Sequence, residues 1–147
     1  MSNTSRLQAL RQSTALVNID LLMDFYDSLE ALSPAFMLGE WDGGVFNTGH
    51  PGEKQLDALN WRGKTFRDAN DVEPIVVHTA DGMRTANNVL GKASLRSVAY
   101  RGVHTATMVY DNHPIFDHFR LIDENTVLGV MDRKGDSFPL FFYLQRV

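Results

Sequence analysis

The fold is decided by residues 105–145, which read TATMVYD-NHP-IFDHFRLI-DEN-TVLGVMD-RKGDS-FPLFFYLQ when the chain is divided at its turns. Four runs rich in β-branched and aromatic residues alternate with three short separators that hold proline, asparagine or glycine. Proline fixes φ, and asparagine and glycine tolerate left-handed backbone, so the separators favour turns. Strands joined by such short connections pair as hairpins. The sequence therefore predicts an antiparallel meander over 105–111, 115–122, 126–132 and 138–145.

The turn lengths predict which residues of neighbouring strands lie opposite each other. The predicted pairs are Met108 with Asp117, Arg120 with Leu128, Ile122 with Thr126, and Met131 with Phe138. Because side chains alternate along a strand, this register sorts them onto two faces. One face is almost wholly apolar and collects Ala106, Met108, Tyr110, Ile115, Asp117, Phe119, Leu121, Val127, Gly129, Met131, Phe138, Leu140 and Phe142. A sheet curled around this face would enclose an interior rich in phenylalanine and methionine.

The opposite face of the meander is mixed, but it carries large apolar side chains such as Phe116, Val130 and Phe141. We expect an N-terminal helix or a second subunit to cover part of it, so a homodimer is one expectation. The helix is predicted over 15–32, and Ser33-Pro34 ends it because the residue before proline avoids helical backbone. Its apolar stripe consists of Leu16, Ile19, Leu22, Met23, Tyr26 and Leu29. The segment before it, residues 1–12, is interpreted as a polar leader.

Further strands and a short lid helix are predicted between the first helix and the meander. The expected strands are 37–46, 61–68, 74–78, 84–90 and 93–100, with turns at 71–73 and 80–82. Glycines around Trp41 favour the kind of bend that closes a barrel. The segment 47–60 holds a helix that starts at Pro51, and its Leu56 and Leu59 are expected to cap a cavity. The prediction is a single, mainly β domain over residues 1–147, an antiparallel barrel with an N-terminal helix and a short lid helix.

Composition excludes several classes of function. The chain has 147 residues, enough for one domain with a sizeable core, and a formal net charge of −4. A negative net charge and the lack of a cluster of lysines and arginines do not indicate a nucleic-acid-binding surface. There is no cysteine, so disulfides, thiolate nucleophiles and cysteine-ligated metals are excluded. With no signal peptide and no apolar run long enough for a membrane helix, we expect a cytoplasmic protein without an integral membrane segment.

Several motifs resemble the GXWXG protein family, beginning with Gly39-Glu40-Trp41-Asp42-Gly43. The likeness continues at Thr48-Gly49-His50-Pro51 and at residues 61–66, so this part covers about 20–66. The C-terminal meander part covers about 90–147, and from Tyr100 onward it resembles the usual C-terminal partner of that family, the domain of unknown function 4334; residues 108–111, 114–120 and 128–135 carry the likeness. The resemblance implies a calycin-like barrel, the group that includes lipocalins, fatty-acid-binding proteins and nitrobindin-like haem barrels. Residues 79–99 match no motif.

Asp117 is the one charged residue on the apolar face, and a buried carboxylate is costly unless it is paired or protonated. We expect it either to be satisfied by a backbone amide, a tyrosine such as Tyr110 or an arginine, or to meet a polar group of a ligand. Arg120 is interpreted as a salt-bridging residue or as a clamp for an acidic head group. The predicted ligand-binding residues are Trp41, His50, Trp61, Met108, Tyr110, Asp117, Phe119, Arg120, Met131 and Phe142.

These features predict the binding of a hydrophobic small molecule, a lipid, fatty acid or phospholipid, in an apolar interior. Two alternatives stay open. One is an enzyme that uses Asp117, Tyr110 or His50 as acid–base groups on a hydrophobic substrate, and the other is haem binding with His50 as an axial ligand. No known catalytic signature and no metal-ligand spacing occurs in the sequence. We therefore expect no metal and no cofactor, and a binding protein rather than an enzyme.

Overall fold

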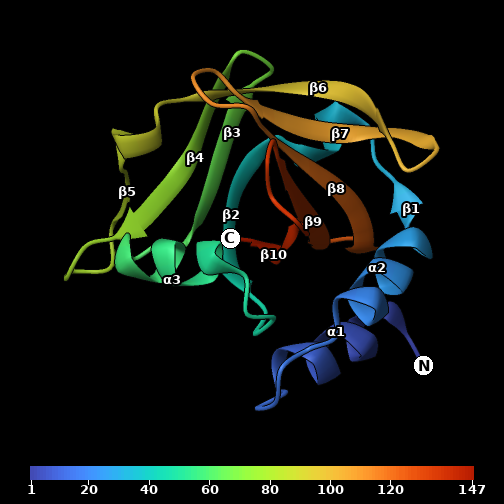
Figure 1. Cartoon of the computed structure of the whole chain (residues 1–147). Coiled ribbons are helices and arrows are strands. Elements are labelled where there is room, and N and C mark those ends of the chain that lie inside the picture. Colours follow the sequence, from blue (N-terminus) through green and yellow to red (C-terminus); the bar gives the residue numbers. More distant parts are fainter.

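The computed structural model describes all residues, 1–147, and shows a closed ring of antiparallel strands (Figure 1). The strands of the ring are β2 (Gly39–Val45), β3 (Gly63–Asp68), β4 (Asp71–His78), β6 (Ala93–Tyr100), β7 (Val103–Tyr110), β8 (Ile115–Asp123), β9 (Thr126–Arg133) and β10 (Leu140–Arg146). Each pairs with the next along the chain, and β10 closes the ring on β2. Two short strands, β1 (Glu30–Ala31) and β5 (Arg84–Ala86), lie beside β8 and β4. The predicted antiparallel barrel is confirmed.

The register predicted for the meander holds in the first hairpin, holds except at the tip in the second, and shifts in the third. Met108 lies opposite Asp117, and Arg120 lies opposite Leu128, as predicted. A bulge after Leu121 places Asp123, rather than Ile122, opposite Thr126. Met131 pairs with Leu140 instead of Phe138. β10 begins only after Pro139, because proline has no N–H to donate to the hydrogen bonds between strands. This shift is two residues, so each side chain keeps its predicted face.

The first strand of the ring shows why glycines flank Trp41. The indole is fully buried in the barrel interior, and its Nε1 donates to the carbonyl of Met37 at 2.8 Å. Gly39 has a φ of +124°, which other residues rarely adopt. At Gly43 a Cβ would lie 2.6 Å from the carbonyl oxygen of Tyr143 on β10. The two glycines therefore let β2 turn into the ring and lie tightly against its closing strand.

Three helices and two 3-10 turns complete the chain. The helices are α1 (Asn3–Arg11), α2 (Ile19–Asp27) and α3 (Pro51–Ala58), and the 3-10 turns are η1 (Pro34–Met37) and η2 (Asn88–Leu90). The prediction of a polar leader over 1–12 was wrong, since α1 buries Leu7. The helix predicted over 15–32 is shorter at both ends. It starts at Ile19 because the Asn18 side chain caps it by accepting from the amides of the first turn, and it ends at Asp27, before β1, so the prediction that Ser33-Pro34 ends it was wrong. Leu16 therefore lies outside the helix, 69% exposed.

The region between α3 and the meander departs from the prediction in two places. Residues 71–73, expected as a turn, are the start of β4, and the turn lies just before them. The strand expected over 84–90 is split into β5 and η2. Because β4 pairs with β5 over Val76–His78 and with β6 only at Val72, β4 and β6 diverge toward the end of the barrel that α3 covers.

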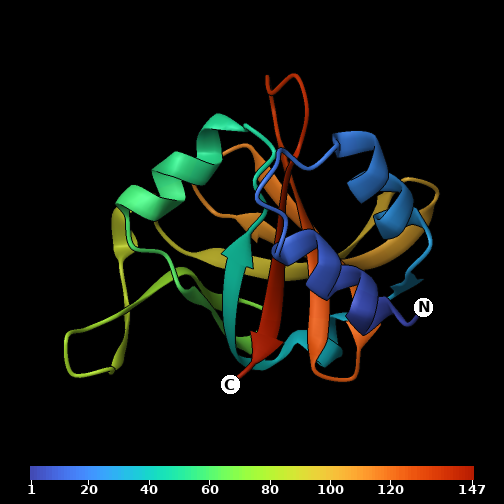
Figure 2. The ribbon, with the colours of Figure 1, turned by 90° about the horizontal axis from the view of Figure 1, so that it is seen from below.

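Two apolar clusters hold the barrel together, one on each side of the sheet. The inner cluster fills the barrel and includes Trp41, Phe66, Phe119 and Phe142. The outer cluster consists of Leu7, Val17, Leu22, Phe25, Tyr26, Leu29, Phe46, Ile122, Leu128, Val130 and Phe141. Figure 2 shows α1 and α2 lying across the outer surface of the barrel. These helices thus cover part of the mixed face of the meander, which is the first of the two expectations, while Phe116 on the same face stays exposed.

None of the three helices is long and apolar enough to cross a membrane.

Candidate functional site

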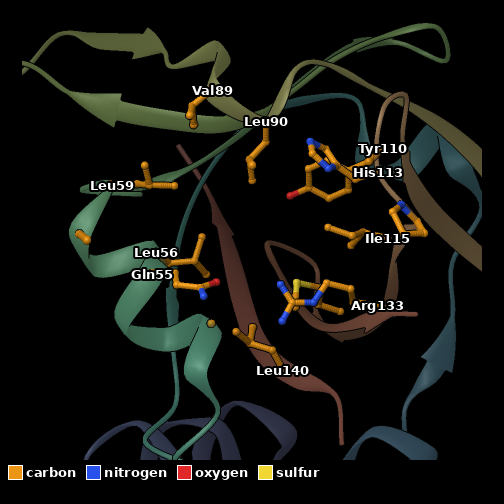
Figure 3. A pocket seen from close by; sticks show the side chains of 14 residues that line it. Gln55, Leu56, Leu59, Val89, Leu90, Tyr110, His113, Ile115, Arg133 and Leu140 are labelled. Carbon is orange, nitrogen blue, oxygen red and sulfur yellow. The ribbon is translucent and has the colours of Figure 1, made fainter. Parts of the chain in front are cut away.

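A pocket of about 440 Å³ lies at the end of the barrel, beneath α3 (Figure 3). Its walls come from α3, from η2 and from the ends of β7, β8, β9 and β10. Nine of the fourteen lining residues are hydrophobic. They are Gly52, Gln55, Leu56, Ala58, Leu59, Val89, Leu90, Tyr110, His113, Pro114, Ile115, Met131, Arg133 and Leu140. The two leucines of α3 that the sequence assigned to a lid, Leu56 and Leu59, lie in this wall.

A small number of polar groups face the apolar walls. The Tyr110 hydroxyl and the Arg133 guanidinium point into the pocket in Figure 3, and His113 lies beside Tyr110 with its ring centroid 6.2 Å away. Burial first, and then the nearby Asp117 carboxylate, raise the pKa of Tyr110 well above its ordinary value. Its hydroxyl therefore stays protonated at neutral pH and acts as a hydrogen-bond donor or acceptor, not as a base.

Arg133 is held in place by a relay of polar side chains. Its Nε and Nη2 both donate to Oδ1 of Asp136, at 3.0 and 2.9 Å. The other carboxylate oxygen lies 3.0 Å from Nε2 of His50. Because Nδ1 of His50 accepts from the amide of Gly52 at 2.9 Å, the ring proton must be on Nε2. Burial alone would raise the pKa of Asp136, but the hydrogen bonds from Arg133 and His50 lower it, so the relay carries a carboxylate.

A buried ion pair lies inside the barrel, below the pocket. Nζ of Lys64 is 3.2 Å from Oδ2 of Asp117, and both side chains are almost completely buried. Lys64 faces inward because it lies directly opposite Trp41 on the neighbouring strand. Its Nζ also donates to the carbonyl of Pro74 at 3.1 Å. The prediction that a tyrosine, an arginine or a backbone amide satisfies Asp117 was therefore wrong, since its partner is a lysine.

Aromatic rings surround the buried ion pair. Nζ of Lys64 lies 5.3–5.9 Å from the ring centroids of Trp61, Tyr110 and Phe142. Burial lowers the pKa of Lys64 and raises the pKa of Asp117, and the attraction between the two groups opposes both shifts. Oδ1 of Asp117 is buried and has no hydrogen-bond partner. An unsatisfied acceptor of this kind costs about 1–3 kcal/mol.

Nine of the ten residues predicted from sequence to bind a ligand separate into three groups. Tyr110 and Met131 line the pocket. Asp117 lies beneath it, and the core around the ion pair contains Trp41, Trp61, Met108, Phe119 and Phe142. His50 lies behind the pocket rim at the start of α3, where it acts through Asp136 on Arg133. The structure thus places most of the predicted set inside the barrel, although only two members face the cavity itself.

Arg120 lies on the other side of the sheet, away from the pocket. Its Nη1 donates to the carbonyls of Tyr26 and Asp27 at 3.1 Å, and its guanidinium stacks over the Tyr26 ring at 4.4 Å. All of its hydrogen bonds go to backbone carbonyls and it does not line the pocket, so the expectations of a salt bridge or a head-group clamp were wrong. Arg120 lies on the outer face because it is paired with Leu128, a member of the outer cluster, and directly paired residues share a face of the sheet. Arg120 caps the end of α2 and fastens that helix to the barrel.

Sequence reasoning missed Lys64, His113 and Arg133. Lys64 could have been predicted to be buried, because it lies on the same strand face as the apolar Phe66. A buried charge needs a partner, which would have marked Lys64 as a candidate for the site. Arg133 and His113 lie in predicted turns, where polar residues are the rule and carry no signal. Their side chains reach the pocket only because the hairpin turns of β7–β8 and β9–β10 lie at the same end of the barrel.

Comparison with known proteins supports both halves of the resemblance. A family model described as GXWXG protein matches residues 24–82, and one described as a domain of unknown function, 4334, matches residues 91–146. A protein from Thermomonospora curvata, known from a crystal structure, is 39% identical with a TM-score of 0.91. That similarity covers 100% of this chain and 99% of the other. No curated protein matches the chain significantly.

Proposed function

Since this chain belongs to the GXWXG protein family and carries the domain of unknown function 4334 in its C-terminal part, we propose that it binds a hydrophobic small molecule with an acidic head group. The binding site is the pocket between α3 and the barrel end. The observation that carries the proposal is this mainly apolar cavity with a fixed guanidinium, Arg133, at its rim. The chemical class is a fatty acid or a related lipid.

The size and lining of the pocket support a ligand of this kind. Small-molecule sites have volumes of roughly 300–1,000 Å³ and combine apolar walls with a few placed polar groups. The pocket, at about 440 Å³ and with mostly hydrophobic walls, fits this description. An acyl chain that replaces water against Leu56, Leu90 and Leu140 would gain about 25 cal/mol for each Å² of apolar surface buried.

Arg133 supports an acidic head group. Two of its nitrogens are used by Asp136, which fixes the plane of the guanidinium, while Nη1 stays free for a ligand. Guanidinium groups bind carboxylates and phosphates through short, charge-assisted hydrogen bonds. The same relay argues against haem, because both ring nitrogens of His50 are occupied and neither is free for iron.

Binding is tested by titrating the protein with cis-parinaric acid, a fatty acid whose fluorescence rises in apolar surroundings. Leu56→Trp should fill the pocket and abolish the rise. Leu16→Trp is the matched control, because Leu16 is 69% exposed and does not line the pocket. The proposal fails if the wild type gives no saturable signal, or if Leu56→Trp binds as well as Leu16→Trp.

The head-group assignment is tested with Arg133→Gln and its neighbour Lys134→Gln, which removes the same charge outside the pocket. Arg133→Gln should weaken the acid about tenfold, the loss of one charge-assisted hydrogen bond, and leave the methyl ester of parinaric acid unaffected. Lys134→Gln should change neither. An equal loss for acid and ester would contradict the role of Arg133.

A further inference from the structure

We propose that Lys64 and Asp117 form an inner polar subsite beneath the pocket, and that this subsite binds a hydroxyl group at the far end of the hydrophobic ligand. The inference rests on the proposed function and narrows its ligand class. It starts from the buried carboxylate oxygen of Asp117 that has no partner.

The ion pair lies directly under the pocket floor. Asp117 follows Ile115 by two residues on the same inward face of β8, which places it about 7 Å further along the strand. On the neighbouring strand it lies opposite Met131. Both Ile115 and Met131 line the pocket, and Tyr110, a third lining residue, lies with its ring 5.9 Å from Nζ of Lys64. One layer of side chains therefore separates the pair from the cavity.

Met131 is the part of this layer that can give way. Its unbranched side chain has three rotatable bonds and adapts to neighbouring groups at little cost. It is also only partly buried, unlike the residues packed around the ion pair. A change of its rotamer would connect the pocket with the free oxygen of Asp117.

The free hydrogen-bonding capacity of the pair selects a hydroxyl. Asp117 offers one free acceptor, Oδ1. An ammonium has three donors, and Lys64 uses two of them on Pro74 and Asp117, which leaves one donor. A hydroxyl both donates and accepts, so it satisfies both atoms at once. A carboxylate would be repelled by Asp117, and a methyl end would leave both atoms unsatisfied.

A purely structural role explains the pair less well. Buried ion pairs stabilise proteins weakly, because the cost of removing two charges from water offsets their attraction. The desolvation cost is repaid only when the remaining donors and acceptors are satisfied, and here one acceptor is not. Groups with such perturbed surroundings next to a cavity are typical of functional sites.

The two polar ends together define a ligand class. Arg133 at the rim fits an acidic head, and the Lys64–Asp117 pair fits a hydroxyl at the other end of the apolar chain. The class is therefore the ω-hydroxy fatty acids, with the carboxylate at the rim and the hydroxyl inside the barrel.

The test is competition against bound cis-parinaric acid by dodecanoic acid, ω-hydroxydodecanoic acid and α-hydroxydodecanoic acid, and by their longer homologues. We expect the ω-hydroxy acid to bind about tenfold more tightly than the plain acid, since it satisfies buried groups that are otherwise unpaired. The α-hydroxy acid, whose hydroxyl stays at the rim, should gain nothing. In the double variant Lys64→Met/Asp117→Leu the ω-hydroxy acid should no longer bind more tightly than the plain acid.

The outcomes separate the two proposals. If all chain lengths of plain and ω-hydroxy acids bind the wild type equally, the inner subsite is wrong and the proposed function stands. If no acid displaces parinaric acid, the proposed function fails. A preference that persists in the double variant would show that the hydroxyl is bound elsewhere and would overturn the inference. The comparison of the two hydroxy acids needs no variant, so it decides the question even if the double variant does not fold.

Discussion

Removing one partner of the Lys64–Asp117 pair should destabilise the protein strongly, whereas removing both should not. Lys64→Met leaves a carboxylate, and Asp117→Leu leaves an ammonium, in a site where both side chains are no more than 4% exposed. Breaking a buried pair in this way costs about 3–5 kcal/mol, while replacing both members by apolar residues is often neutral or stabilising. For a chain of this length each kcal/mol lowers Tm by about 2–4 °C, so each single variant should melt roughly 6–20 °C lower.

The pH dependence of Lys64→Met gives a second, independent readout. Without the lysine, only burial acts on Asp117, and burial raises its pKa. The unfolded chain loses this proton near pH 4, while the folded chain keeps it to a higher pH. Because the folded state then binds more protons, stability should fall as pH rises above about 4, by up to about 1.4 kcal/mol per pH unit until the folded pKa is reached.

The assay is denaturant unfolding followed by tryptophan fluorescence, since Trp41 and Trp61 are both buried next to the pair. A double-mutant cycle at pH 7 gives the coupling, and repetition at pH 4 to 8 gives the slope. The double variant Lys64→Met/Asp117→Leu should show neither the loss nor the slope. The reasoning is refuted if the two single losses add up to the loss in the double variant, because the groups would then not interact.

Three further predictions concern the frame of the barrel. Gly43→Ala should cost about 1–3 kcal/mol in the free energy of unfolding, because the added methyl would lie 2.6 Å from the carbonyl of Tyr143. Arg120→Met should cost about 1.5–3 kcal/mol and increase hydrogen exchange in α2, since the last carbonyls of that helix lose a charged donor. Burial lowers the pKa of His118 below 6.5, so on acidification the unfolded chain binds a proton at this residue before the folded chain does. The free energy of unfolding should therefore fall as the pH drops below 6.5. The fall should be smaller in His118→Phe, whose ring can still stack on Tyr100.

Each of these has its own contradicting result. An unchanged unfolding midpoint in Gly43→Ala would show that β2 and β10 can separate without loss. Equal exchange rates in α2 for Arg120→Met and wild type would mean that apolar packing alone holds the helix. A wild type and a His118→Phe variant with identical stability curves between pH 5 and 7 would remove His118 from the pH response.

The sequence determined the barrel and the faces of its strands because both depend on local patterns. Alternation has a period of two, so the two-residue shift at Met131 kept the predicted faces, and the bulge after Leu121 lies at the tip of its hairpin, beyond the paired residues that face the interior. The start of α3 at Pro51 was equally local, since proline suits the first helical turn. Asp117 was identified as the exceptional residue for the same reason, a charge at a position whose neighbours are apolar.

The tertiary structure alone decided which residues meet. Lys64 reaches Asp117 because closure of the barrel brings the inward faces of β3 and β8 together across the interior. His50 meets Asp136, 86 residues away, only because α3 lies over the β9–β10 turn. Arg120 became a helix cap when α2 packed on the outer face. Such contacts depend on how whole elements pack in space, and a pattern within one segment carries no information about the segment that will lie across from it.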